Sequence, residues 1–226
     1  MNINTIDVLR WAHILCMVYW LGGEWGVFQT SYNVVNRNLS LDERRRHMET
    51  AYRIDILART GIILLLPLGL HMGHLYGLQP LGGLWLVAMW GLVALWTALA
   101  WSAFIARETD LGLRLTKIDE FIRYLLIPVL FIVAVSSLLG HGPLTIGPGT
   151  RWYGLKLFLY AFALCIGLGL RFIMRAWTAR FRKLALGPNP QEEAALEREI
   201  GYARAMAYVY WVTIASVCFL GAVKPL

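Results

Sequence analysis

Long apolar stretches alternate with short polar connections along the whole chain, and this pattern indicates the fold class. A helix needs about 20 apolar residues to cross the hydrocarbon core of a bilayer. Six stretches of this kind are present: Ile6–Phe28, Asp55–Leu75, Gly83–Ile105, Phe121–Leu139, Tyr153–Ala176 and Ala203–Val223. The sequence therefore predicts an all-α, polytopic bundle of six transmembrane helices, built as one integral membrane domain over residues 1–226.

Polar residues between the stretches predict where some helices extend beyond the membrane. Ser40 followed by Glu43 is a capping-box pattern, so the second helix is expected to start there, before its apolar part. The segment Gly187–Pro190 reads GPNP and is expected to join two helical extensions. The segment Glu108–Asp119 is expected to be a loop on the same side.

Composition and charge agree with a membrane protein and predict its orientation. The chain is 58% hydrophobic and only 15% charged. Of the 21 Lys and Arg residues, 17 fall in or beside the first, third and fifth connections and 4 on the opposite side. Because basic loops stay in the cytoplasm, both termini are expected to face outward. The net charge of +7 follows from this asymmetry, so we expect no nucleic-acid partner.

Four of the five histidines are predicted to lie at one depth, in the outer third of the membrane. His13 follows the start of the first stretch, His71 and His74 end the second, and His141 ends the fourth. Ionisable groups inside a membrane are rare and need a partner, so they are candidates for a functional site. Imidazoles from two helices are common axial ligands of haem b, so these four residues predict one haem, or two if all four pair.

The first helix carries a polar stripe that should face the inside of the bundle. Its spacing of four, three and four residues places His13, Met17, Trp20 and Glu24 on one face. On the second helix, Gly69 and Gly73 leave room for a flat macrocycle beside the backbone.

Cations on the outer side could hold the two carboxylates of a haem. Arg10, Arg151 and Lys156 are predicted near the required depth, and Trp20 is a further residue expected to contact the cofactor. Lys156 is alternatively a catalytic group, or a lysine that extends its charge to the membrane surface.

Glu24 lies deep in the first stretch, where an unpaired carboxylate is unfavourable. One interpretation is a structural ion pair with Arg59, which could also pair with Asp55 one turn away. The other is a relay for protons or for a quinol, which makes Glu24 a second catalytic candidate.

Two other interpretations of the same residues remain open. The histidines could simply bind backbone carbonyls and water at the membrane surface. Alternatively, thiols, thioethers and imidazoles suit copper(I). The residues available for such a site are His13, Cys16, Met17, His71, Met72 and His74.

Several short motifs resemble a group of small bacterial membrane proteins. These are the HemJ-type protoporphyrinogen oxidases, the CopD-type copper-resistance proteins and the membrane domain of cytochrome-c-linked urate oxidases. The segments that carry the resemblance are Trp11–Leu15, Trp20–Gly23, Arg44–Thr60, Trp152–Leu157 and Ala222–Leu226. The last two are most similar to the HemJ type, whose first-helix histidine and motif lysine correspond to His13 and Lys156.

The chain also departs from that family. Gly154 stands where a histidine usually precedes the motif lysine, and the segment Leu81–Thr150 has no counterpart. The resemblance therefore covers the first, second, fifth and sixth helices. It implies a haem-binding redox protein of the bacterial inner membrane.

Together these features predict electron transfer between a substrate or quinol and an acceptor on the outer face. A periplasmic cytochrome c or a dehydrogenase subunit is the expected acceptor. The alternatives are a protoporphyrinogen IX oxidase, a copper-handling membrane protein and a structural subunit of a larger complex.

Overall fold

Six helices joined by short connections account for almost the whole chain. The computed structural model describes residues 4–107, 109–144 and 147–225, and these residues contain no strand. The helices are α1 (Thr5–Val34), α2 (Leu41–Leu75), α3 (Leu84–Ile105), α4 (Asp110–Leu138), α5 (Arg151–Leu184) and α6 (Pro190–Val223). The predicted all-α bundle of six helices is confirmed.

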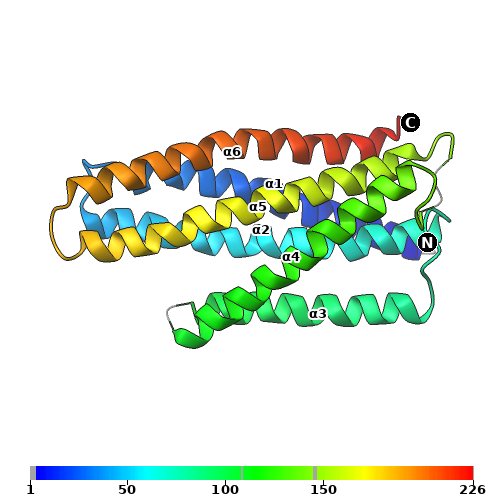
Figure 1. The fold of residues 1–226 in the computed structure, drawn as a ribbon, viewed down its shortest axis with the longest axis horizontal. Helices are drawn as coiled ribbons and strands as arrows, with labels where there is room; N and C mark the ends of the chain where they lie inside the picture. Colours follow the sequence, from blue (N-terminus) through cyan, green and yellow to red (C-terminus); the bar gives the residue numbers. More distant parts are fainter. Residues whose placement is uncertain (1–3, 108, 145–146, 226) are drawn as a thin grey trace.

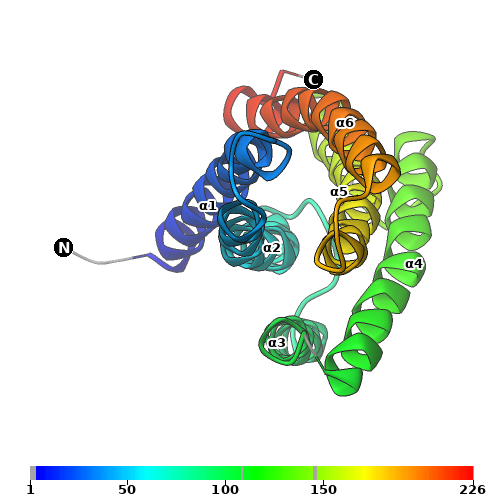
Figure 2. The ribbon, with the colours of Figure 1, turned by 90° about the vertical axis from the view of Figure 1, so that its left-hand side faces the viewer.

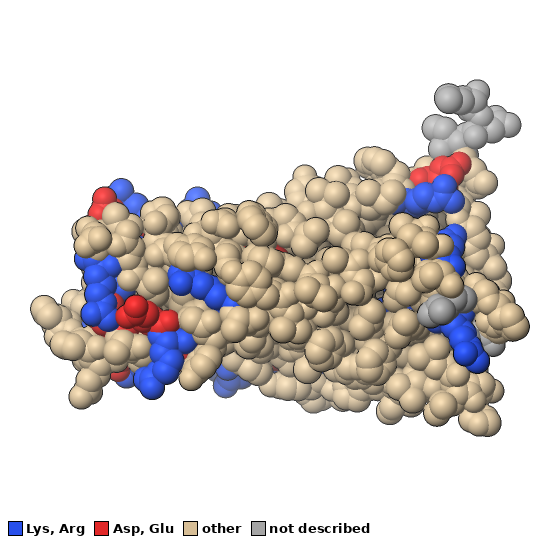
Figure 3. Space-filling view, turned by 90° about the horizontal axis from the view of Figure 1, so that it is seen from above, with Lys and Arg blue, Asp and Glu red and all other residues tan. Residues whose placement is uncertain are grey.

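Five of the helices, α2 to α6, are long and apolar enough to cross a membrane. The remaining helix, α1, has 30 residues and is also long enough to cross a membrane, but Asp7, Arg10 and Glu24 interrupt its apolar sequence. Charged side chains gather at the two ends of the molecule, and the broad band between them is almost free of them on the face seen in Figure 3. The chain is thus a multi-pass membrane protein.

The two ends of the bundle differ in what they carry. Both termini lie at one end, together with the α2–α3 and α4–α5 connections (Figure 1). We call this the terminal end. The other three connections lie at the opposite end, which we call the basic end because it holds most of the Lys and Arg residues.

The helices form a central group and a flanking pair. In Figure 2, α1, α2, α5 and α6 lie together, and α3 and α4 lie outside them. The main packing pairs are α1 with α2 and α5 with α6. The flanking pair is attached through α3 to α2 and through α4 to α5.

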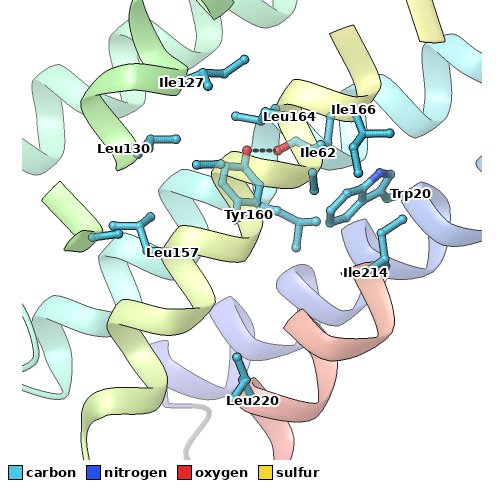
Figure 4. Packing of buried hydrophobic residues seen from close by; sticks show 14 of the residues in the cluster. Trp20, Ile62, Ile127, Leu130, Leu157, Tyr160, Leu164, Ile166, Ile214 and Leu220 are labelled. Atoms are coloured by element: carbon cyan, nitrogen blue, oxygen red, sulfur yellow. Dashed lines mark hydrogen bonds between the residues drawn. The ribbon is translucent and has the colours of Figure 1, made fainter. Parts of the chain in front are cut away.

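Tyrosines bridge α2 and α5, whose backbones pack less closely than the other neighbours. The Tyr160 hydroxyl of α5 donates to the carbonyl of Ile62 at 2.7 Å, a bond that Figure 4 shows within the apolar core. Nearer the basic end, the Tyr52 hydroxyl of α2 donates to the carbonyl of Met174 at 2.7 Å. These side chains hold the two helices at a distance that leaves space between them.

Helix ends were predicted with mixed success. The capping box is present, since Ser40 accepts from the backbone of Glu43 and α2 begins there as expected. Asn189, the third residue of the GPNP segment, caps α6, which confirms the two helical extensions. The predicted loop over 108–119 was wrong, because Thr109 caps a helix that starts at Asp110; residue 108 lies outside the described residues. Low hydropathy marked where α4 leaves the membrane, and the helix itself continues beyond that point.

At the basic end, α1, α2, α5 and α6 continue beyond the membrane as a small helical head. Helices α2, α5 and α6 have 34 or 35 residues, which is about 50 Å of helix against a hydrocarbon core of about 30 Å. The head has its own apolar cluster, which includes Val34, Trp177 and Ile200. A buried guanidinium, that of Arg44, pairs with both carboxylate oxygens of Glu193 at 2.7 Å.

Candidate functional site

A cavity of about 500 Å³ lies between the four central helices in the terminal half of the bundle. This volume is typical of sites for small molecules and cofactors, and so is the predominance of apolar and aromatic walls. The walls come from all four helices, for example Ile14 of α1, Leu65 of α2, Leu157 of α5 and Val217 of α6. Gly69 and Gly73 of α2 line the cavity, but the room for a macrocycle that the sequence suggested beside Gly73 is taken by the Tyr153 ring, which a Cβ at Gly73 would meet.

The His13 imidazole lines this cavity and has no hydrogen-bond partner in the described part of the chain. Its Nδ1 atom is fully buried. The ring lies against α2, with Cε1 3.5 Å from the position that a Cβ at Gly69 would take. A buried, unpaired imidazole nitrogen is unfavourable in the protein alone, so this side chain is available to a bound group.

Three cations stand around the same cavity. Arg10 lines its mouth and donates to the hydroxyl of Tyr76 at 2.8 Å, and the Lys224 ammonium lies 5.2 Å from the centre of the Tyr76 ring. Lys156 lies deeper, close enough to His13 for electrostatic interaction. Among the described residues, neither lysine forms an ion pair with a carboxylate. The cavity is therefore suited to a molecule with an apolar body and anionic groups at one end.

Trp20 forms part of the cavity floor toward the basic end. It is 1% exposed, and its indole nitrogen donates to the hydroxyl of Tyr210 at 2.9 Å. Its ring also meets that of Tyr160 edge to face. Aromatic side chains from α1, α5 and α6 thus close the cavity on this side.

The other three histidines lie outside the cavity. His71 accepts a hydrogen bond at Nδ1 from the indole of Trp90 on α3, at 3.3 Å. His74 packs against the turn at Gly82, and His141 is exposed just beyond the end of α4. Of the four histidines, the structure brings only His13 into this cavity. Arg151 likewise starts α5 on the exposed surface and does not line it.

A layer of buried charges lies beyond the cavity floor. Glu24 is close enough to Asp55 and Arg59 to interact with them, but Arg59 forms its ion pair with Asp55. No ion pair of Glu24 is present among the described residues. Farther across the bundle, the fully buried Asp119 of α4 pairs with Arg171 of α5.

Sulfur atoms also reach the cavity, from Met17, Met72 and Cys218. Cys16 instead packs into the neighbouring apolar core. Among the described residues, no group of three or more His, Cys, Asp or Glu side chains is placed to hold a metal ion. A copper site here would have to combine His13 with the sulfur atoms of Met17, Met72 and Cys218.

Sequence reasoning missed Lys224 and Tyr76, which meet at the cavity mouth. Lys224 follows the last turn of α6, and Tyr76 follows the last turn of α2. Both positions can be recognised in the sequence as polar residues at the ends of outward-running helices, but their proximity depends on how the helices pack. No family model, curated protein or solved structure matches this chain, so the site is interpreted from its own geometry.

Proposed function

We propose that this chain is a membrane-embedded redox protein that holds one haem b in the cavity between α1, α2, α5 and α6. It passes electrons between a quinol or another reduced substrate and an acceptor at the terminal end, such as a cytochrome c or a dehydrogenase subunit. The observation that carries the proposal is the buried, unpartnered Nδ1 atom of His13 in a cavity with cations at its mouth.

The residues present fit this group. His13 is the candidate axial ligand, and the apolar walls suit the face of a porphyrin. Arg10, Lys156 and Lys224 are the candidate partners of its two carboxylates. When bound, haem b supplies one-electron redox chemistry, while the chain supplies binding, orientation and exclusion of water. One histidine in a cavity of this size supports one haem.

The position of the cavity supports the choice of acceptor. It lies in the terminal half of the bundle, and its mouth is formed by Arg10, Tyr76 and Lys224 at the terminal end. Under the predicted orientation this end faces the outside of the cytoplasmic membrane. An acceptor that docks there comes near the cavity without entering the bilayer.

The test is the absorption spectrum of the detergent-purified protein, oxidised and reduced, with haem quantified in a pyridine extract. We expect a Soret band and close to one haem per chain. His13→Ala should lose the haem, and the matched variant His71→Ala should keep it, because His71 faces α3. Purified wild-type protein without haem would overturn the proposal, and so would equal haem content in the two variants.

A second candidate is the oxidation of a porphyrinogen, favoured by the position of Lys156 beside His13 in one cavity. A porphyrinogen has the same combination of a tetrapyrrole body and carboxylates as haem. The cavity has room for one macrocycle, so the two candidates compete for the same space. Expression in a bacterial strain that lacks protoporphyrinogen oxidation separates them: restored haem synthesis supports the second candidate, and failure with the protein present in the membrane excludes it.

A further inference from the structure

A second hollow, almost entirely apolar, lies between the central helices and the flanking pair. This groove has a volume of about 570 Å³ and is lined by residues of α2, α3 and α4. Along α3 its lining runs from Trp85 to Leu99, which is about 21 Å of helix. Leu95 of α3, one of its lining residues, is 70% exposed, so the groove borders the bilayer.

The groove and the cavity share two residues of α2 as a common wall. Leu66 and Leu70 line both spaces, and they stand one turn apart on the same face of the helix. Tyr160 bridges α2 and α5 beyond them (Figure 4), where the backbones of these two helices are not closely packed. A molecule in the groove is therefore separated from the cavity by two leucine side chains.

The chemistry of the groove limits what can occupy it. None of the described residues that line it is charged, whereas the neighbouring cavity is lined by three cations. A phospholipid brings a phosphate, which needs such cations, so the groove favours a long apolar molecule with a neutral head. The groove does have a polar end, where Gln79 lines it and bonds to the carbonyls of Leu70 and Leu81.

His74 lies beside that polar end, packed against Gly82, and does not itself line the groove. It continues the stripe of Leu66 and Leu70 by one more turn toward the terminal end. Its Nδ1 atom is buried and has no partner among the residues that the structure describes. A long apolar wall that ends at polar side chains, Gln79 in the lining and His74 beside it, matches the tail and head of an isoprenoid quinol.

We propose that the groove between α2, α3 and α4 is the binding site of a membrane quinol, with its isoprenoid tail along α3 and its ring near His74. The inference rests on the proposed function, because it places the electron donor one wall away from the cavity. It also assigns a role to the flanking pair, α3 and α4. The family resemblance covers the other four helices and implies no role for these two.

The test measures binding of decylubiquinone to the purified protein by quenching of tryptophan fluorescence, since Trp85 and Trp96 line the groove. Ala88→Phe fills the groove from α3, and Val87→Phe adds the same side chain at the adjacent position, which is 68% exposed and does not line it. We expect Ala88→Phe to weaken binding at least tenfold and Val87→Phe to leave it unchanged. His74→Ala should weaken binding less, and both phenylalanine variants should keep haem.

Each outcome decides one of the two proposals. Equal affinities for the two phenylalanine variants, or no quenching of the wild-type protein, would overturn the groove proposal even when haem is present. A co-purified phospholipid that decylubiquinone does not displace, detected by native mass spectrometry, would also overturn it. Quinone binding by a protein without haem would support the groove and reject the proposed cofactor.

Discussion

Single glycines set how closely α1 and α2 approach, and this approach positions His13. A Cβ at the buried Gly61 of α2 would lie 2.5 Å from the carbonyl oxygen of Cys16 and 3.2 Å from the backbone nitrogen of Trp20. On α1, a Cβ at Gly23 would lie 2.7 Å from the Cβ of Ala58. Small residues at such crossings let helices in a membrane pack backbone to backbone.

Gly61→Ala is therefore expected to destabilise the protein. The added methyl group meets backbone atoms of α1, which cannot rotate away, and overpacking of this kind typically costs about 1–3 kcal/mol. The matched control is Gly22→Ala on α1, where nothing lies within 4 Å and helix propensity favours alanine by about 1 kcal/mol. Unfolding in detergent by added SDS should show a loss for Gly61→Ala and no loss for Gly22→Ala. Equal stability of both variants would contradict the close approach.

At this scale the sequence predicted some side-chain directions and not others. The stripe on the first helix placed His13, Met17 and Trp20 on one face, and all three line the cavity. The direction of His71 could not be predicted, because it depends on which face of α2 meets which neighbour. Gly69 lies on the cavity side, and a residue two positions later points about 200° away, toward α3.

Among the elements, the flanking pair depends on buried charges for its attachment. Asp119 of α4 accepts a hydrogen bond from the indole of Trp96 on α3 at 2.6 Å and pairs with Arg171 of α5. Arg123, one turn along α4, lies 3.4 Å from the same carboxylate. One carboxylate therefore connects three helices in a place that excludes water.

Asp119→Asn should weaken this attachment strongly. The substitution removes the charge partner of Arg123 and leaves Arg171 with only its longer ion pair to Glu120, at 3.7 Å; breaking a buried ion pair in this way costs about 3–5 kcal/mol. The matched control is Asp110→Asn in the exposed first turn of the same helix, which should change stability little. Limited proteolysis in the α3–α4 connection, together with SDS unfolding, measures both effects. Similar behaviour of the two variants would show that the charge is not needed for packing.

A helix boundary can be predicted from the sequence where the residues next to it determine it. The capping box at Ser40 and the cap at Asn189 act within one turn, so both could be predicted from neighbouring residues. The start of α4 was missed because charged residues interrupt its first ten residues and hydropathy reports only the part inside the membrane. The groove was also missed, because it needs α3 to stand away from the central helices.

At the scale of the whole molecule, the two ends of the bundle differ in structure. The basic end is a closed helical head, in which ion pairs such as Arg44 with Glu193 tie α2 to α6. The terminal end is open, because the cavity mouth lies there among Arg10, Tyr76 and Lys224. The proposed electron path therefore runs from the bilayer through the groove to the terminal end, and the side on which that end lies determines the acceptor.

The distribution of basic residues predicts that the terminal end faces outward, and single cysteines can test this. Pro80→Cys in the α2–α3 connection and Asn38→Cys in the α1–α2 connection are both exposed and lie at opposite ends. In cells with a permeable outer membrane, a membrane-impermeant maleimide should label Pro80→Cys. It should label Asn38→Cys only after the inner membrane is opened, and the unsubstituted chain controls for the three native cysteines, which lie within helices. The reverse labelling would place the cavity mouth in the cytoplasm, where a periplasmic cytochrome c cannot reach it, and the acceptor would then have to be cytoplasmic.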